Sequence, residues 1–178
     1  MRMRIVEHDQ TYNQLASHFD CGNYYINYFL RTESLNNDIS KTYLLVDEEA
    51  QYILGFFSLS ADTLVEILER EQYQQMRPAI RIYMFAVDKK YQHQKFNFCK
   101  KQCTIASFLL SYCIKKIKSI VQKNIGACFI ILSSTHEGYQ LYRNKGDFEV
   151  LDEDMKFIDI VGSTNMIDMY RNIEIQDD

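Results

Sequence analysis

Three consecutive segments in the middle of the chain decide its fold: 79–87 (AIRIYMFAV), 105–123 (IASFLLSYCIKKIKSIVQK) and 127–132 (ACFIIL). The first and third are apolar runs of strand length, which is typical of strands covered on both faces. Between them, apolar side chains recur at helical spacing and most of the lysines lie off that stripe. A strand, a helix and a strand in this order predict a right-handed crossover that makes the two strands parallel neighbours.

Weaker patterns on either side predict the other elements. Strands are expected at 3–7, 42–46, 51–60, 148–151 and 155–160, and a helix is expected to begin after Asn23. Thr63 and Glu66 lie at capping-box spacing and predict a helix through residue 71, which Pro78 then separates from the next strand. A last helix is expected over 136–145, closed by Gly146.

These elements predict an α/β (α+β) protein with one mixed central sheet and helices on both faces. The chain has 178 residues, of which 47% are hydrophobic, so a single domain over 1–178 is expected. Its core spans 1–160, and residues 161–178 are expected to form a C-terminal tail or helix. No apolar run approaches the roughly 20 residues of a membrane-spanning helix, which favours a cytoplasmic protein with no membrane partner.

The five cysteines are odd in number and contain no Cys-x-x-Cys pair, so we expect reduced thiols and no metal site. Cys99 and Cys103 lie four residues apart, but no partner pair follows at zinc-ligand spacing.

Charge is distributed unevenly along the chain. The formal net charge is −4, yet residues 89–136 contain nine lysines and no carboxylate, whereas both flanking parts are strongly acidic. A bound polyanion is one explanation, and a lysine-coated helix face is the other. The position of the segment favours the first, because it joins the end of a strand to the N-terminus of a helix. Unpaired amides of residues 105–107, preceded by Lys100 and Lys101, are typical of a phosphate or pyrophosphate site.

Several segments carry a family resemblance. The order AVDKKYQ (86–92), TIASFLL (104–110), FIILSS (129–134) and GYQLYRNKGDF (138–148) resembles the GCN5-related N-acetyltransferases over roughly residues 1–160. FDCGNYYINYFL (19–30) and GFFSLS (55–60) are similar to the subgroup that includes toxin-type acetyltransferases. The resemblance implies the acyl-CoA N-acyltransferase fold, with acetyl-CoA as the cofactor.

In that family a motif Gln/Arg-x-x-Gly-x-Gly/Ala wraps the cofactor's pyrophosphate, and residues 101–106 (KQCTIA) are its best counterpart here. Lys101 replaces Gln/Arg, Thr104 replaces the first Gly, and about ten extra residues (91–100) precede the motif. Thr104 can serve as the helix N-cap, while added lysines offset the lost glycine. By resemblance, the cofactor-binding residues are Phe85, Ala86, Val87, Lys100, Lys101, Gln102, Thr104, Ile105, Ala106, Ser107 and Thr135.

Tyr142 falls in a Tyr-x-x-x-Gly-x-Phe pattern, one residue longer than the family's version. The resemblance implies that this tyrosine protonates the departing CoA thiolate, and a packed aromatic residue of an amphipathic helix is the alternative. No general base is evident, because Asp88, His93, His136 and Glu137 are equally interpreted as solvated loop residues.

The resulting hypothesis is an N-acetyltransferase that moves an acetyl group from acetyl-CoA to a primary amine. The acceptor is left open between a small molecule, a protein and an aminoacyl-RNA, and so are a homodimer and an antitoxin-like partner. One alternative is a degenerate member of the fold that serves as an interaction domain. Another is a nucleic-acid-binding module that uses segment 89–123, with Tyr91, Phe96 and Phe98 as stacking groups.

Overall fold

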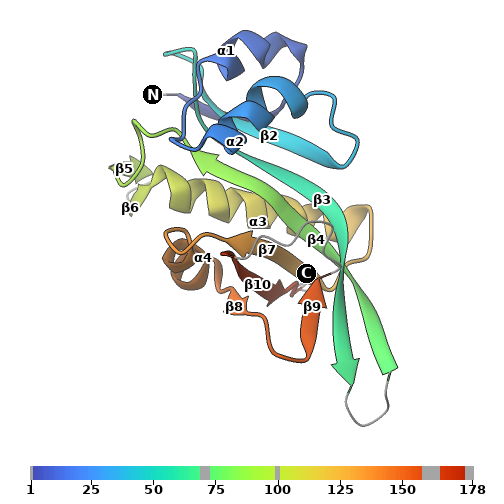
Figure 1. The fold of residues 1–178 in the computed structure, drawn as a ribbon. Coiled ribbons are helices and arrows are strands. Elements are labelled where there is room, and N and C mark those ends of the chain that lie inside the picture. Colours follow the sequence, from blue (N-terminus) through green and yellow to red (C-terminus); the bar gives the residue numbers. More distant parts are fainter. Residues whose placement is uncertain (1, 69–72, 99–100, 158–164, 175–178) are drawn as a thin grey trace. The chain divides into compact units, whose positions relative to one another are not determined.

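The computed structural model describes residues 2–68, 73–98, 101–157 and 165–174 (Figure 1). It divides into two compact units, one of residues 1–60 and 83–109, the other of residues 61–82 and 110–178. Three elements continue from one unit into the other: β3 (Tyr52–Leu68), β4 (Tyr73–Val87) and α3 (Ile105–Lys123). The single domain expected over 1–178 stays a prediction.

The first unit contains an antiparallel meander followed by a small hairpin. Its strand order is β1 (Met3–Glu7), β2 (Ser40–Asp47), β3 and β4, and both the β1–β2 and β2–β3 pairs are antiparallel. Between β1 and β2 the chain forms η1 (Gln10–Tyr12), α1 (Asn13–Ser17), α2 (Tyr24–Tyr28) and the π-helical turn η2 (Phe29–Glu33). Strands β5 (Lys95–Phe98) and β6 (Lys101–Thr104) form a separate two-stranded sheet.

Helix α2 begins where the sequence predicts. The Asn23 side chain accepts hydrogen bonds from the backbone amides of Tyr25 and Ile26, at 3.0 and 3.2 Å, so two of the orphan donors of the first turn are satisfied. The apolar residues that follow, Phe29 and Leu30, are buried together with residues of α1, β2 and β3. Burial of this apolar stripe attaches the short helices to one face of the first unit's sheet.

Gly55 of β3 brings helix α3 onto the opposite face. A Cβ atom at this position would lie 2.7 Å from the Ala86 backbone oxygen and 3.0 Å from the Leu109 side chain. Phe56, the next residue along the strand, packs edge to face on Phe19, with 5.3 Å between ring centroids. Successive strand residues point to opposite faces, so helices cover both faces here, as predicted.

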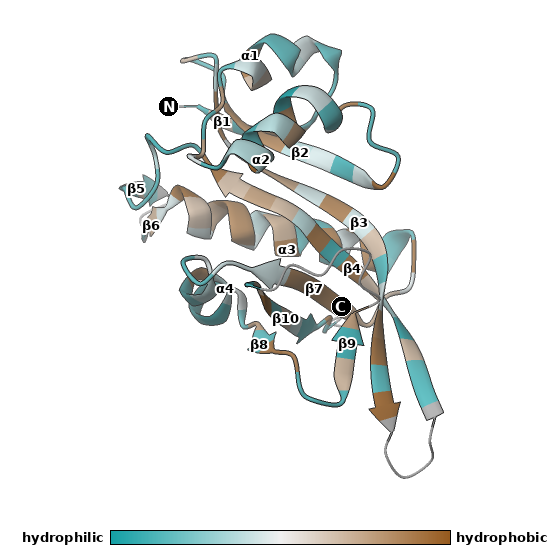
Figure 2. Ribbon diagram, in the orientation of Figure 1, coloured by the Kyte–Doolittle hydropathy of each residue, from teal (hydrophilic) through white to brown (hydrophobic). Residues whose placement is uncertain are grey.

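The second unit contains the predicted crossover. Strand β7 (Phe129–Ser134) pairs in parallel with β4, with Ala79 opposite Phe129, and α3 ends in the same unit. Strand β10 (Ile167–Asn172) then pairs antiparallel with β7 and with β8 (Glu149–Val150), while β9 (Met155–Phe157) pairs with β3. Helix α4 (Tyr139–Gly146) is predominantly hydrophilic, in contrast to the apolar β7 (Figure 2).

The helix predicted over 63–71 is wrong, because β3 continues as a strand to Leu68. Leu64 pairs with Phe157 of β9 and is fully buried, and the Asp62 carboxylate forms an ion pair with Arg81 of β4. Pro78 lies inside β4, where its carbonyl accepts a hydrogen bond from the Cys128 amide at 2.8 Å. Strand pairing across the unit therefore outweighs the local capping signal.

Two predictions near the C-terminus also need correction. Of the tail or helix expected over 161–178, the structure describes residues 165–174, and 167–172 of these form strand β10. Residues 161–164 and 175–178 lie outside the described residues. Helix α4 starts at Tyr139 instead of residue 136, because the Gly138 amide bonds back to Thr135 in a preceding turn. The helix ends at Gly146, and the left-handed residue that closes it is Asp147, with a φ of 53°.

Gly55→Ala tests the close approach of α3. We expect this change to lower the free energy of unfolding by about 1–3 kcal/mol, because the new methyl group overlaps backbone that cannot move freely. The matched control is Gly126→Ala, where a Cβ meets nothing within 4 Å. Urea unfolding of both variants measures the difference, and equal stabilities would contradict the packing described at Gly55.

Candidate functional site

The carboxyl end of β4 in the first unit is organised by the buried carboxylate of Asp88. Its Oδ2 accepts hydrogen bonds from the Tyr52 hydroxyl at 2.6 Å and the Asp20 amide at 3.1 Å, and its Oδ1 accepts from the Lys90 amide at 2.9 Å. Asp88 is fully buried, so these charge-assisted bonds replace its hydration. Burial and the adjacent carboxylate raise the pKa of Tyr52 well above its usual range. The tyrosine therefore stays a neutral donor to Asp88.

The loop after Asp88 is bonded to the segment that precedes α2. The Lys89 amide donates to the Asp20 carbonyl at 2.9 Å, and the Lys89 ammonium lies 2.5 Å from the Asp20 carboxylate. The Gln92 side chain donates to the carbonyls of Val87 and Cys21, at 2.8 and 3.0 Å. The hydrogen bond from Lys89, with further bonds from the Gly22 amide and an asparagine side chain, holds the pKa of the Asp20 carboxyl far below its usual range.

The predicted pyrophosphate motif has an unexpected conformation. Residues 101–104 form strand β6 instead of a loop, and Lys100 lies outside the described residues. Thr104 caps α3 as expected: its Oγ1 accepts from the Ser107 amide at 3.1 Å and lies 2.9 Å from the Ser107 hydroxyl. Gln102 is exposed, whereas Ala106 and Ser107 are half-buried.

The other first-unit residues predicted to bind the cofactor have little side chain to offer. Ile105, Ala86 and Val87 are buried, and Phe85 is half-buried. Only backbone groups of Ile105 and of residues 86–87 are suited to contact a ligand. A Cβ atom on Gly55 would lie 3.0 Å from the Leu109 side chain and 3.4 Å from the Val87 Cα. The first turns of α3 therefore pack beside the end of β4.

In the second unit the structure brings Thr135 and Tyr142 together. Around the position of a Cβ on Gly138, the Ser134 hydroxyl lies at 3.0 Å, the Tyr142 ring at 3.3 Å and the Thr135 hydroxyl at 3.4 Å. A glycine at the start of α4 therefore lets two hydroxyl groups and an aromatic ring converge. The Thr135 Oγ1 also accepts from the Gly138 amide at 3.2 Å, which fixes this side chain.

Tyr142 itself is buried and packs edge to face on Phe148, with ring centroids 6.0 Å apart. Burial raises the pKa of Tyr142 well above that of an ordinary tyrosine, and Cys113 adds a smaller effect in the same direction. Its hydroxyl therefore keeps its proton at neutral pH. Both interpretations of this residue, a packed aromatic and a proton donor, agree with these contacts.

The four residues weighed as general bases differ in their surroundings. His93, His136 and Glu137 are exposed, as a solvated loop residue would be. Asp88 is not, because it is buried and accepts three hydrogen bonds. These bonds hold Asp88 as a structural acceptor. Its partners Tyr52 and Asp20 were not predicted, since nothing local in the sequence connects them to residue 88.

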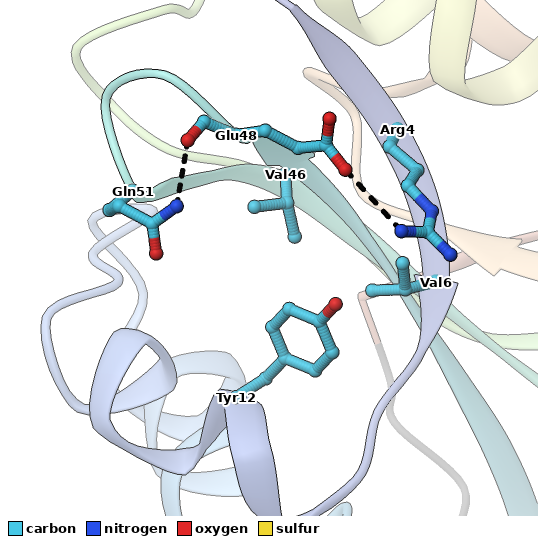
Figure 3. Close-up of a pocket in the computed structure, with 6 residues that line it drawn as sticks. All are labelled: Arg4, Val6, Tyr12, Val46, Glu48 and Gln51. Atoms are coloured by element: carbon cyan, nitrogen blue, oxygen red, sulfur yellow. Dashed lines mark hydrogen bonds and ion pairs between the residues drawn. The ribbon is translucent and has the colours of Figure 1, made fainter.

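The first unit also has a pocket of about 270 Å³ beside β1 (Figure 3). The polar side chains that line it are bonded to one another. Arg4 forms an ion pair with Glu48 at 3.4 Å, and the Gln51 side chain donates a hydrogen bond to the Glu48 carbonyl at 2.7 Å. Val6, Tyr12 and Val46 complete the lining. None of the sequence-predicted site residues lines this pocket, so it is not the predicted cofactor site.

Clusters of metal ligands and membrane-spanning helices are not found in the part of the chain that the structure describes. There, no three His, Cys, Asp or Glu residues come together as metal ligands would, and the four described cysteines are free thiols. Of the two cysteines that lie four residues apart in sequence, Cys103 is in β6 and Cys99 lies outside that part. No described helix is long and apolar enough to cross a membrane.

Comparison with known proteins gives matches among solved structures. No protein-family model and no curated protein matches the chain. A structure described as a bacterial toxin matches with a TM-score of 0.73 and 19% identity, covering 97% of this chain and 91% of its own. AtaTR bound with acetyl-CoA matches with a TM-score of 0.70 and 16% identity, covering 96% of this chain and 94% of that one. AtaT complexed with acetyl-methionyl-tRNA matches with a TM-score of 0.64 and 18% identity, covering 88% of this chain and 94% of that one.

These matches span nearly the whole of both chains, so the two units and their connections follow the order found in these toxins. The α/β fold with a mixed sheet, expected from the order of the elements and from the resemblance to the GCN5-related N-acetyltransferases, is confirmed. Identities below 20% show the fold alone, so this likeness does not by itself establish an activity.

Asp88→Asn tests the role assigned to the buried carboxylate. We expect the free energy of unfolding to fall by about 1–3 kcal/mol. The NH2 group of the new asparagine cannot accept a hydrogen bond, so at least one of the three donors to residue 88 loses its acceptor. Tyr52→Phe removes one donor and should cost less, and the double variant should be less destabilised than the two effects added. The exposed Asp38 supplies the control Asp38→Asn. Additive effects in thermal or urea unfolding would contradict a shared network.

Proposed function

We propose that this protein is an acetyl-CoA-dependent N-acetyltransferase whose acceptor is the α-amine of an aminoacyl-tRNA. The observation that carries the proposal is the likeness in fold, over nearly the full length, to toxins solved with acetyl-CoA and with acetyl-methionyl-tRNA. The contacts at the N-terminus of α3 and around Tyr142 support it.

Acetyl-CoA is assigned to the end of β4 and the first turn of α3. Thr104 caps Ser107, and the amides of Ile105 and Ala106 are first-turn donors that have no acceptor within the helix. Together with the positive end of the helix dipole, these amides are suited to a pyrophosphate. Lys100 and Lys101 precede them in sequence and would add charge.

The chemistry is aminolysis of a thioester. The neutral amine nitrogen attacks the thioester carbon, a C–N bond forms, the C–S bond breaks, and the electron pair leaves with sulfur. The amine loses a proton to water, since none of the described residues is placed as its base, and the thiolate gains one. We assign the second proton transfer to the Tyr142 hydroxyl. Burial raises the pKa of this hydroxyl, so a transfer to the thiolate that is uphill by about 2 kcal/mol for ordinary pKa values is more uphill here and requires close contact with sulfur. The tyrosinate then regains a proton from water.

The acceptor and partners are inferred from the same toxins. AtaT is solved with acetyl-methionyl-tRNA, and a tyrosine-to-phenylalanine mutant of it is solved bound to the C-terminus of the antitoxin AtaR. We extend both to this chain: an aminoacyl-tRNA as the acceptor and an antitoxin as a protein partner. The carboxylate-free segment 89–136 supplies the positive charge that a tRNA would meet. A homodimer and a cytoplasmic location belong to the same proposal.

A degenerate domain that binds without turnover is the second candidate. The observation that favours it is the conformation of residues 101–104, which form a strand where the family motif wraps the pyrophosphate. This candidate predicts either no acetyl-CoA binding or binding without transfer. The experiments below separate it from the enzyme.

Titration with acetyl-CoA by calorimetry tests the cofactor site. We expect micromolar binding that falls at least tenfold in Ala106→Glu, because the new carboxylate faces the pyrophosphate. Ala106→Gln, of equal size but uncharged, should bind nearly as well as the unchanged protein. A glutamate in the first helical turn also favours the helix, so loss of folding is not expected. Equal affinity in all three proteins would contradict the assigned site.

Tyr142→Phe tests the proton donor. The ring packing on Phe148 is kept and the hydroxyl is lost, so kcat should fall about 100-fold or more while acetyl-CoA affinity changes little. Tyr139→Phe, in the same helix, is the control and should retain activity. The measurement is transfer of radiolabelled acetyl groups to a mixture of charged tRNAs, with uncharged tRNA as the blank. Full activity in Tyr142→Phe would exclude this residue as the acid.

Transfer to charged tRNA also tests the acceptor. Label in the charged pool and none in the uncharged pool is the expected result. Acetyl-CoA binding without label in either pool would refute the proposed acceptor and favour the degenerate domain.

A further inference from the structure

Helix α2 presents three tyrosines to solvent. Tyr24 is 72% exposed, Tyr25 is 78% exposed and Tyr28 is 47% exposed. The rings of Tyr24 and Tyr28, one turn apart, are stacked with centroids 6.1 Å apart, and Tyr25 contacts Tyr24 edge to face at 5.6 Å. We call these three residues the tyrosine face. It is a continuous aromatic surface on a helix of five residues.

Burial in the core does not account for the tyrosine face. The inward side of α2 is formed by Ile26 and Asn27, and the chain then continues into the buried Phe29 and Leu30. The Asn27 side chain donates to the Asp20 carboxylate at 2.8 Å. The helix is therefore held on its other side, and the large exposed aromatic area is available for a ligand.

Basic residues accompany the tyrosine face. Loop 89–92 lies against segment 20–21, through the bonds of Lys89 to Asp20 and of Gln92 to Cys21, and α2 begins three residues after Cys21. Lys89 is paired with Asp20. The exposed Lys90 and Lys95 follow in a segment without a carboxylate, and the Lys90 ammonium lies over the Tyr52 ring, 4.7 Å from its centroid. Exposed stacking rings together with a basic segment are the combination that holds single-stranded nucleic acid.

The residues first considered for stacking are less suited to it. Tyr91 and Phe96 are half-buried and contact each other, with ring centroids 6.3 Å apart, and Tyr91 also contacts Tyr52. The side chain of Phe98 lies outside the described residues. Among the described aromatic rings of the first unit, the three tyrosines of α2 are the most exposed, ahead of Tyr83.

We propose that the tyrosine face binds unpaired nucleotides of an RNA by stacking on their bases, with Lys90 and Lys95 contacting the phosphates. The choice of RNA as the ligand rests on the proposed function, because the 3′ end of an aminoacyl-tRNA is single-stranded. Tyrosine stacks on any base while its hydroxyl stays hydrated. A second copy of this chain is a poorer occupant, because a symmetric contact through this face would bring like-charged lysines together.

The test is direct binding of a 5′-fluorescein-labelled octanucleotide RNA ending in CCA, followed by anisotropy, with duplex RNA of the same length for comparison. We expect the Tyr24→Ser/Tyr25→Ser double variant to bind the single strand at least tenfold more weakly, and the duplex unchanged. Tyr24→Phe/Tyr25→Phe keeps the rings and should bind normally. Tyr112→Ser, at an exposed tyrosine of α3, is the control.

Unchanged single-strand affinity in the serine variant would overturn the proposal, and so would an equal loss in the phenylalanine variant, since stacking does not need the hydroxyl. A fall in oligomer size in sedimentation, with RNA binding intact, would assign the face to a second copy instead. No acetyl-CoA is present, so these outcomes are independent of turnover. An inactive protein that loses single-strand binding in the serine variant refutes the transferase and supports the tyrosine face.

Discussion

The buried carboxylate of Asp88 is the constraint on which the first unit's ligand end depends. It follows the last residue of β4 and accepts hydrogen bonds from three places: a strand, the segment before α2, and its own loop. A charged group of this kind is costly to bury unless each lone pair has a donor. The donors are therefore held in position, and with them the start of α2 and the path of loop 89–92. Both the assigned cofactor end of β4 and the tyrosine face rest on this arrangement.

The parts of the fold that were predictable from sequence are those with long periodic signals. Helix α3 begins and ends at the predicted residues, since nineteen residues of amphipathic pattern leave little freedom. The parallel pairing of β4 with β7 follows from the crossover. Thr63 and Glu66 wrongly predicted a helix because a capping box is a local signal. Leu64 and Asp62 are stabilised more strongly by their partners on other strands, β9 and β4. In the tail, β10 has no strong pattern of its own and is a strand because β7 and β8 supply its partners.

The candidate site was predictable only in part. Thr104 as a cap follows from its place before the amphipathic segment of α3. Thr135 and Tyr142 were named by resemblance, and the structure adds that they lie close together. The Asp88 network was not predictable, because its partners lie 36 and 68 residues away and are an ordinary tyrosine and a backbone amide. The three tyrosines of the tyrosine face are evident in the sequence, but their exposure was not predictable. It depends on which side of the short helix α2 packs against the core. The cofactor roles of residues 85–87 and 101–107 stay predictions, because they derive from resemblance.

Four of the ten extra residues that precede the family motif, 95–98, form β5, which pairs with β6 before α3. Lys95 is paired with Thr104, so the first and last residues of the hairpin are cross-strand neighbours. Neighbours of this kind have Cα atoms about 5 Å apart, although the intervening chain would span several times that length if extended. The hairpin therefore brings the chain back beside Lys95 at Thr104, where α3 begins. Loop 88–94 covers the distance from β4 to the start of α3, and the hairpin adds surface without lengthening that path.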